Sequence, residues 1–166
     1  MRPLLLLAIF LAVAPAASAR TRVDLDPLPD TSVGRVAGTR AFIGVSLHGD
    51  RLRVYACDGT LERDPAISVW FRSRWDGQRP LVLRRGGHRL RLRPDLGGRL
   101  DGHAFRTQRA SMPAGLFRGH HKRLRMTWII LRNGKKRGTM VSTRKPCRFV
   151  LVTGANGQQQ WVSVCN

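Results

Sequence analysis

Short segments of alternating apolar and polar residues, separated by glycine-containing turns, recur along most of this 166-residue chain. In "AFIGVSLHGDRLRVYACDG" at 41–59, Gly49 and Asp50 form a two-residue hairpin loop. That loop sets three apolar pairs on one side of the sheet: Leu47 with Leu52, Val45 with Val54, and Ile43 with Ala56. The opposite side carries Phe42, Gly44, Ser46 and His48 against Cys57, Tyr55, Arg53 and Arg51. Since the apolar side forms the core, these arginines are expected to face water or a ligand.

The same pattern continues downstream. The segment "SVWFRSRWDGQRPLVLR" at 68–84 predicts two strands around a turn that contains Asp76 and Gly77. "PLVLRRGGHRLRLRPD" at 80–95 turns at two glycines, which pairs Leu83 with Leu90, Leu81 with Leu92, Arg84 with Arg89, and Val82 with Arg91. Another short strand pair is expected in "GGRLDGHAFRTQ" at 97–108.

The strongest local hairpin signal is "HKRLRMTWIILRNGKKRGTMVST" at 121–143. Asn133 and Gly134 both tolerate the positive φ that a type I′ turn requires, so they are predicted to form its loop. With apolar alternation throughout and no convincing amphipathic helix, we expect an all-β fold. It should consist of eight to ten antiparallel strands in meander order that curl into a barrel or a sandwich.

The first 40 residues predict a different organisation. Residues 1–19 combine a positive start, an apolar run and the small-x-small pattern at Ala17-Ser18-Ala19, which predicts a signal peptide cleaved after Ala19 and a secreted chain without a transmembrane segment. Residues 20–40 hold two prolines and little periodicity, which indicates an extended linker or arm. Residues 41–166 are then expected to form a single β domain.

Charge is distributed unevenly along the chain. Residues 20–76 hold nine basic and eight acidic residues, whereas residues 77–166 hold twenty basic and two acidic ones. Such a field attracts polyanions, namely nucleic acid, anionic cell-wall polymer, glycan or an anionic membrane surface. Arginine outnumbers lysine 26 to 4, a bias that codon usage could also produce without any ligand.

Two predicted hairpins concentrate the basic residues. Like charges directly across a strand pair destabilise it unless the side chains splay into water or an anion lies between them. The candidate anion-binding residues are therefore Arg84, Arg89, Arg91 and Arg93 on the first hairpin, and Arg132, Lys135, Lys136 and Arg137 on the second. Trp75 is a candidate for stacking on a base or a sugar ring, with packing over the barrel end as its alternative.

The cysteines bear on the last hairpin, "CRFVLVTGANGQQQWVSVC" at 147–165. A three-residue loop of Ala155, Asn156 and Gly157 places Cys147 opposite Cys165, which favours a disulfide between them. A pairing that uses Cys57 is the alternative. If Cys147 and Cys165 pair, Cys57 is a free thiol, and it could simply be a small buried apolar residue.

Five short motifs occur here in a characteristic order: "VYACDG", "VWFRS", "LRLRPDLGGRLDGHAF", "AGLFR" and "WIILRNGKKRG". Over residues 41–141 this order resembles a group of uncharacterised secreted or envelope-associated actinobacterial proteins with motifs such as "YVCDG", "AGLYRA" and "GWIVLPDGRQVG". The resemblance implies a secreted β-rich domain and carries no catalytic residue or ligand. This chain departs from the pattern at 132–138 and in its cysteine-bounded hairpin.

Other function classes find less support. No nucleophile motif or metal-ligand spacing is present, and carboxylates are scarce in the second half of the chain, so neither a cofactor nor a metal is expected and an enzyme is disfavoured. The sequence therefore favours non-specific binding of a polyanion. The first alternative is a closed barrel that holds a small apolar ligand, with arginines serving solubility only. A hydrolase or thiol enzyme comes third.

Overall fold

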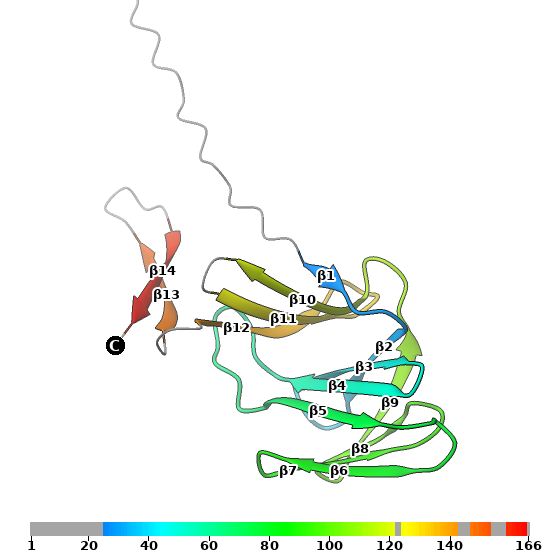
Figure 1. Cartoon of the computed structure of the whole chain (residues 1–166). Helices are drawn as coiled ribbons and strands as arrows, with labels where there is room; N and C mark the ends of the chain where they lie inside the picture. Colours follow the sequence, from blue (N-terminus) through cyan, green and yellow to red (C-terminus); the bar gives the residue numbers. More distant parts are fainter. Residues whose placement is uncertain (1–24, 122–123, 143–146, 154–158, 166) are drawn as a thin grey trace, which may run out of the picture.

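The computed structural model describes residues 25–121, 124–142, 147–153 and 159–165. Within these residues every regular element is a β-strand, and every strand pair is antiparallel. The strands form an eight-stranded sheet, a four-stranded sheet and a two-stranded hairpin (Figure 1). Their bounds are β1 Asp26–Pro27, β2 Thr31–Val36, β3 Phe42–His48, β4 Arg51–Cys57, β5 Ser68–Arg74, β6 Leu81–Arg85, β7 His88–Leu92, β8 Gly98–Leu100, β9 His103–Arg109, β10 Gly115–His121, β11 Leu124–Ile130, β12 Lys136–Ser142, β13 Cys147–Thr153 and β14 Gln159–Cys165.

The eight-stranded sheet has the strand order β5-β4-β3-β2-β9-β8-β7-β6. It consists of two four-stranded meanders, β2–β5 and β6–β9, joined where β2 pairs with β9. The two end strands, β5 and β6, also contact each other, so the sheet nearly closes into a barrel (Figure 1). The predicted all-β, antiparallel fold is therefore confirmed, and of the two expected forms, barrel or sandwich, the eight-stranded sheet is barrel-like. The segment with Asp76 and Gly77 connects the two ends of this sheet.

Strand register follows the turn residues closely in the barrel. Leu47 lies opposite Leu52 and Leu83 opposite Leu90, as the Gly49-Asp50 and Gly86-Gly87 turns predict. The apolar sides of all eight strands face inward. Fourteen buried residues fill the barrel: Val36, Ala41, Ile43, Val45, Leu52, Val54, Ala56, Val69, Phe71, Trp75, Leu90, Leu92, Leu100 and Phe105.

Regular structure begins before Ala41, so the prediction of a linker or arm over residues 20–40 is wrong for its second half. Strand β2 lies between β3 and β9 and sends Val33 and Val36 into two different core clusters. Thr31, Ser32 and Val33 are all buried, so both faces of β2 are covered over this part and its residues do not alternate between polar and apolar, whereas Arg35 near its end is exposed. Gly34 is required there, since a Cβ at this position would overlap the Arg106 carbonyl oxygen on β9.

The four-stranded sheet, in the order β1-β10-β11-β12, lies over the outer face of the barrel (Figure 1). Between the layers is a second core of Leu28, Val33, Phe42, Tyr55, Cys57, Ala114, Leu116, Ile129 and Leu131. The outer side of β3 and β4 is thus only partly solvated: this second layer buries Phe42, Tyr55 and Cys57. Gly44 permits the close approach, because a Cβ there would lie 3.1 Å from Leu116 Cβ.

The β11–β12 hairpin forms as predicted, but its turn is of another type. Ile130 pairs with Lys136, and the Gly134 amide donates to the Leu131 carbonyl at 2.9 Å. Gly134 has a φ of 76°, whereas Asn133 is not among the residues with positive φ. Asn133 instead accepts a hydrogen bond from the Lys135 amide with its side-chain oxygen, at 3.1 Å. This is a three-residue loop with one left-handed glycine, which shifts the register by one residue from that of a type I′ turn.

In the last hairpin, β13 and β14 pair in the register that places Cys147 opposite Cys165. Loop residues 154–158 and the two cysteine side chains lie outside the part of the chain whose side chains are described, as does the predicted signal peptide at 1–19. Over the described residues, no helix has the length and apolar character needed to span a bilayer.

Candidate anion-binding surface

Arginine side chains face one another in pairs on the outer face of the barrel. The register places Arg84 opposite Arg89, Arg91 opposite Arg99, and Arg35 opposite Arg106. Each points outward because its strand neighbours, such as Leu83, Leu90 and Leu100, occupy the core side of the sheet. We call these six residues the arginine ladder.

All six ladder arginines are exposed, and they lie on the consecutive neighbouring strands β6, β7, β8, β9 and β2. Residues directly opposite in an antiparallel pair have Cβ atoms about 4.5–5.5 Å apart, so each pair brings two positive charges close together. Such pairs are destabilising unless the guanidinium groups separate into water or share an anion. An anion that bound between paired ladder arginines would therefore reduce their mutual repulsion.

The last two acidic side chains of the sequence, Asp95 and Asp101, lie near the ladder but form no ion pair with its arginines. Asp95 accepts hydrogen bonds from the Gly97 amide at 3.0 Å and from the Arg93 guanidinium at 2.9 Å, and these two contacts hold its pKa below the ordinary value. Asp101 is partly desolvated, which raises its pKa, but hydrogen bonds from the Arg89 amide and the His88 ring outweigh this effect and lower it. Among the described residues, no ion pair involves a ladder arginine.

Of the four candidate anion-binding residues on the first hairpin, three lie together on one surface. Arg84, Arg89 and Arg91 belong to the ladder, and the cross-strand contact between Arg84 and Arg89 has the predicted register. Arg93 lies beyond the end of β7, where its ion pair with Asp95 neutralises it. Arg93 therefore lies outside the ladder and contacts Asp95 in the same tight turn, and its assignment as an anion-binding residue stays a prediction.

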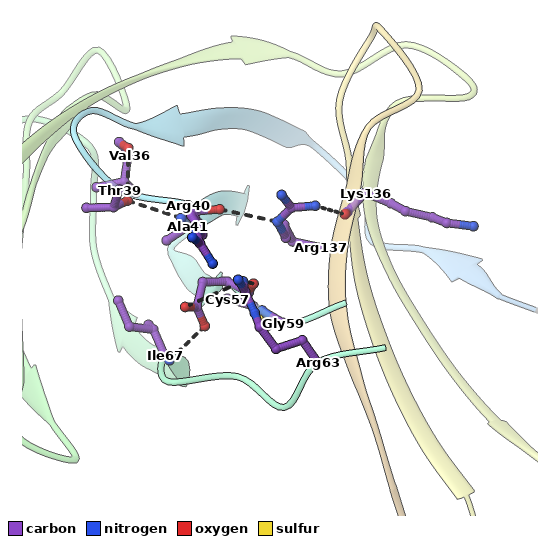
Figure 2. A network of polar contacts seen from close by, with 11 residues as sticks. Val36, Thr39, Arg40, Ala41, Cys57, Gly59, Arg63, Ile67, Lys136 and Arg137 are labelled. Atoms are coloured by element: carbon purple, nitrogen blue, oxygen red, sulfur yellow. Dashed lines mark hydrogen bonds and ion pairs between the residues drawn. The ribbon is translucent and has the colours of Figure 1, made fainter. Parts of the chain in front are cut away.

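In the second predicted cluster, the two arginines attach the hairpin to the barrel. Arg132 donates to the Arg109 carbonyl at 2.9 Å, and Arg137 donates to the Arg40 carbonyl at 3.3 Å. Figure 2 shows Arg137 reaching from β12 toward Arg40, while Lys136 points away. Lys135 and Lys136 are exposed and remain available to an anion.

Phe42 connects the hairpin to the ladder. The guanidinium carbon of Arg137 lies 4.9 Å from the centroid of the Phe42 ring, and that of ladder residue Arg35 lies 5.9 Å from it. Both contacts have cation–π geometry, which holds the two arginines beside the same ring. The basic hairpin therefore adjoins the β2 end of the ladder.

Trp75 is not available for stacking. Its side chain is 6% exposed and packs into the barrel core, and its indole N–H donates to the Arg79 carbonyl at 2.7 Å. The alternative, packing over the end of the barrel, is the observed arrangement.

The described residues contain no group of three or more potential ligands that could hold a metal ion. Cys57 is a fully buried free thiol whose Sγ accepts a hydrogen bond from the Gly59 amide at 3.3 Å. Burial raises its pKa, which disfavours the reactive thiolate. Two histidines, His48 and His88, are engaged with carboxylates that belong to turns.

Three of the six ladder residues were not predicted from the sequence as anion-binding residues. Arg99 and Arg106 lie on β8 and β9, which were predicted as strands without a register, and Arg35 lies in the segment predicted as an arm. The pairing of β8 with β7 would have revealed Arg99, because Arg91 is already on the outer face. The contact between Arg35 and Arg106 joins two meanders, and no local turn specifies it.

No family model, curated protein or solved structure matches this chain.

Proposed function

We propose that this protein binds polyanions non-specifically through the arginine ladder and the adjoining lysines of the β11–β12 hairpin. The observation that carries the proposal is the set of three arginine pairs, directly opposite across neighbouring strands, without a carboxylate partner in any ion pair of the described residues. Arginine forks match the oxygen geometry of phosphate and sulfate groups.

The shape of the ladder favours a polymer over a single small anion. Neighbouring strands in a sheet are about 4.8 Å apart, so the ladder presents guanidinium groups at short intervals across five strands. An anion bound between two of them leaves the others unsatisfied, whereas a chain of charged groups contacts several pairs at once. Such contacts go to the charged backbone of a polymer and carry little sequence information.

The surroundings of the protein are part of the proposal. A leader at 1–19, cleaved after Ala19, would release it outside the cytoplasm, and the resemblance to secreted or envelope-associated actinobacterial proteins agrees with that location. Candidate partners there are anionic cell-wall polymers, glycans, extracellular nucleic acid and anionic membrane surfaces. Amino-terminal sequencing of the exported protein is expected to begin at Arg20; an intact Met1 would contradict export by this route.

We further infer a Cys147–Cys165 disulfide across β13 and β14, since the strand register sets these residues opposite each other. The fully buried Cys57 is a poor partner for either of them. One reactive thiol is expected in unreduced, denatured protein, and three after reduction. Three thiols without reduction would exclude the bridge.

The alternative of an apolar-ligand barrel receives less support. Large side chains such as Phe71, Leu90 and Leu92 are fully buried inside the barrel, where that ligand would have to lie. The enzyme alternative has no favourable observation, because the one cysteine with a described side chain is buried and protonated.

The test is retention on heparin and on duplex DNA at low salt, with vesicles of anionic and neutral lipid as a third matrix. The double variant Arg91→Gln/Arg99→Gln removes one ladder pair and is expected to elute at clearly lower salt. The matched control, Arg51→Gln/Arg74→Gln, removes an exposed cross-strand arginine pair from β4 and β5, outside the ladder. Equal loss from both variants would mean that net charge, not the ladder, causes retention. No retention of the parent protein would reject the function.

A further inference from the structure

A cavity of about 1040 Å³ lies between the two sheets, and no ladder residue lines it. One wall is the outer face of β4 and β5, and the other is the inner face of β10, β11 and β12. A cavity of this size is at the upper end of the range for small-molecule sites. The polyanion site proposed above does not use it.

Four arginines line this cleft. Arg53 and Arg72 are directly opposite each other on β4 and β5, while Arg118 and Arg125 come from β10 and β11. Partial burial lowers the pKa of Arg118, and the charges of Arg72, Arg53 and Arg125 lower it further. The charges of the other three guanidinium groups therefore act on Arg118, two of them across the gap between the layers.

The counter-charge in the cleft is small. Asp26 is the one carboxylate among the lining residues, and its Cα lies opposite that of Arg118 in the β1–β10 pair. No described ion pair joins Asp26 to any of the four arginines. At neutral pH the lining thus carries four guanidinium charges against one carboxylate, and a bound anion would relieve that excess.

Trp70 holds two of the arginines in place. The guanidinium carbons of Arg118 and Arg72 lie 5.4 Å and 5.8 Å from the centroid of its ring, and the Tyr55 ring packs against it at 4.8 Å between centroids. Cation–π contact with a half-buried indole orients a guanidinium before any ligand arrives. Such prior orientation reduces the entropy lost on binding.

The remainder of the lining suits an uncharged molecular body. Tyr55 links the layers through its hydroxyl, which is hydrogen-bonded to Ser68 at 3.1 Å and to Thr139 at 3.0 Å. Val141 is 55% exposed and lines the same cleft, together with Leu124. Hydroxyl groups and apolar surface beside the arginines indicate a ligand with a ring or another compact body attached to its anionic group.

We propose that this cleft binds a small organic phosphate of about nucleotide size, with the phosphate between Arg72 and Arg118 and the organic body against Leu124 and Val141. A phosphate carries about −1.5 to −2 charges at neutral pH and three acceptor oxygens, which suits several guanidinium forks better than a carboxylate with a single charge. The proposal is independent of the polyanion function, because no ladder residue lines the cleft.

The test is calorimetric titration of the full mature protein at low salt with adenosine monophosphate, adenosine and inorganic phosphate as separate probes. Adenosine monophosphate is expected to bind at least about tenfold more tightly than either fragment, because both the charge and the ring make contacts. Its binding should also quench tryptophan fluorescence, and the quench should be absent in Trp70→Phe.

Two double variants separate this site from the ladder. Arg72→Gln/Arg118→Gln is expected to weaken adenosine monophosphate binding by about tenfold or more and to change heparin retention only slightly. Arg91→Gln/Arg99→Gln should lower heparin retention and leave adenosine monophosphate binding nearly unchanged. Equal affinity for adenosine monophosphate and inorganic phosphate would overturn the organic-phosphate class, and unchanged affinity in Arg72→Gln/Arg118→Gln would remove the cleft as the site. Absence of heparin retention in the parent protein, with its nucleotide binding intact, would reject the polyanion function alone.

Discussion

The arginine ladder and the arginine cleft use the same side chain in opposite ways. Ladder arginines lie side by side on the outer face of one sheet, and all six are exposed. Cleft arginines come from two layers and converge, and two of them are held against Trp70. The ladder can follow an extended polymer, whereas the cleft can surround a small anion. The excess of arginine in this chain thus contributes to two surfaces of different shape.

The cleft depends on the layer contact more than the ladder does, because its walls come from both sheets. Leu116→Ala removes a fully buried side chain from the core between the sheets, and we expect a loss of about 2–5 kcal/mol in the free energy of unfolding. Urea unfolding measures this loss. In the folded variant, organic phosphate binding should fall while heparin retention persists. Leu90→Ala, inside the barrel, is the matched comparison, and equal effects of the two variants on both ligands would contradict separate surfaces.

The joint between β2 and β9 is the feature on which the ladder depends. Gly34→Ala places a methyl group against the Arg106 carbonyl on β9, which must move for the strands to remain paired. Such overpacking costs about 1–3 kcal/mol, measurable by thermal or urea unfolding. Heparin retention should decrease although no charge has changed. Unaltered stability would show that the close approach of these strands is not needed.

Tyr55 tests the polar link between the layers. Tyr55→Phe removes the hydroxyl that is hydrogen-bonded to Ser68 and Thr139 and keeps the ring that packs on Trp70. A loss of about 1 kcal/mol in unfolding free energy is expected, since a typical net contribution is 0.5–1.5 kcal/mol per hydrogen bond. Adenosine monophosphate affinity, followed by titration, should fall modestly. A gain in stability would mean that this hydroxyl is not satisfied by its two partners.

Asp101 gives the smallest expected effect and tests whether the ladder is free of counter-charge. Its pKa is lowered in the folded protein, so its contribution to stability is complete above the ordinary value for aspartate, about 3.9, and is lost as the pH falls through the folded value. Asp101→Asn should therefore show a weaker decline in stability than the parent protein between pH 5 and pH 3. Parallel curves would contradict the hydrogen bonds assigned to Asp101. A large rise in heparin retention would show that Asp101 neutralises the ladder.

Local sequence predicts the barrel better than the cleft. Two-residue glycine turns determine the registers of β3–β4 and β6–β7, so the arginine pair Arg84 and Arg89 could be deduced from the sequence. The Asn133-Gly134 turn was assigned a wrong register because a left-handed glycine also fits a three-residue loop. Arg53 was correctly assigned to the outer side of its strand, but the layer that covers that side could not be derived from alternation.

The cleft requires information that no hairpin contains. Arg53 lies opposite Arg72, but the long connection over 58–67 between β4 and β5 does not specify this register as a two-residue turn would. The approach of Arg118 and Arg125 depends on packing β10 and β11 over the barrel, which small residues such as Gly44 permit. Contacts between layers lie far apart in sequence, and periodicity within one strand does not specify them.

The salt dependence of DNA binding tests the ladder most directly. For a protein that contacts Z phosphates of duplex DNA, the logarithm of affinity falls with the logarithm of salt concentration with a slope of about −0.9Z. Replacing Arg84, Arg89, Arg91 and Arg99 with glutamine should make the slope shallower by roughly one unit per contacted phosphate lost. Arg51→Gln/Arg74→Gln should leave it nearly unchanged. An unaltered slope in the four-residue variant would contradict polyanion binding by the ladder.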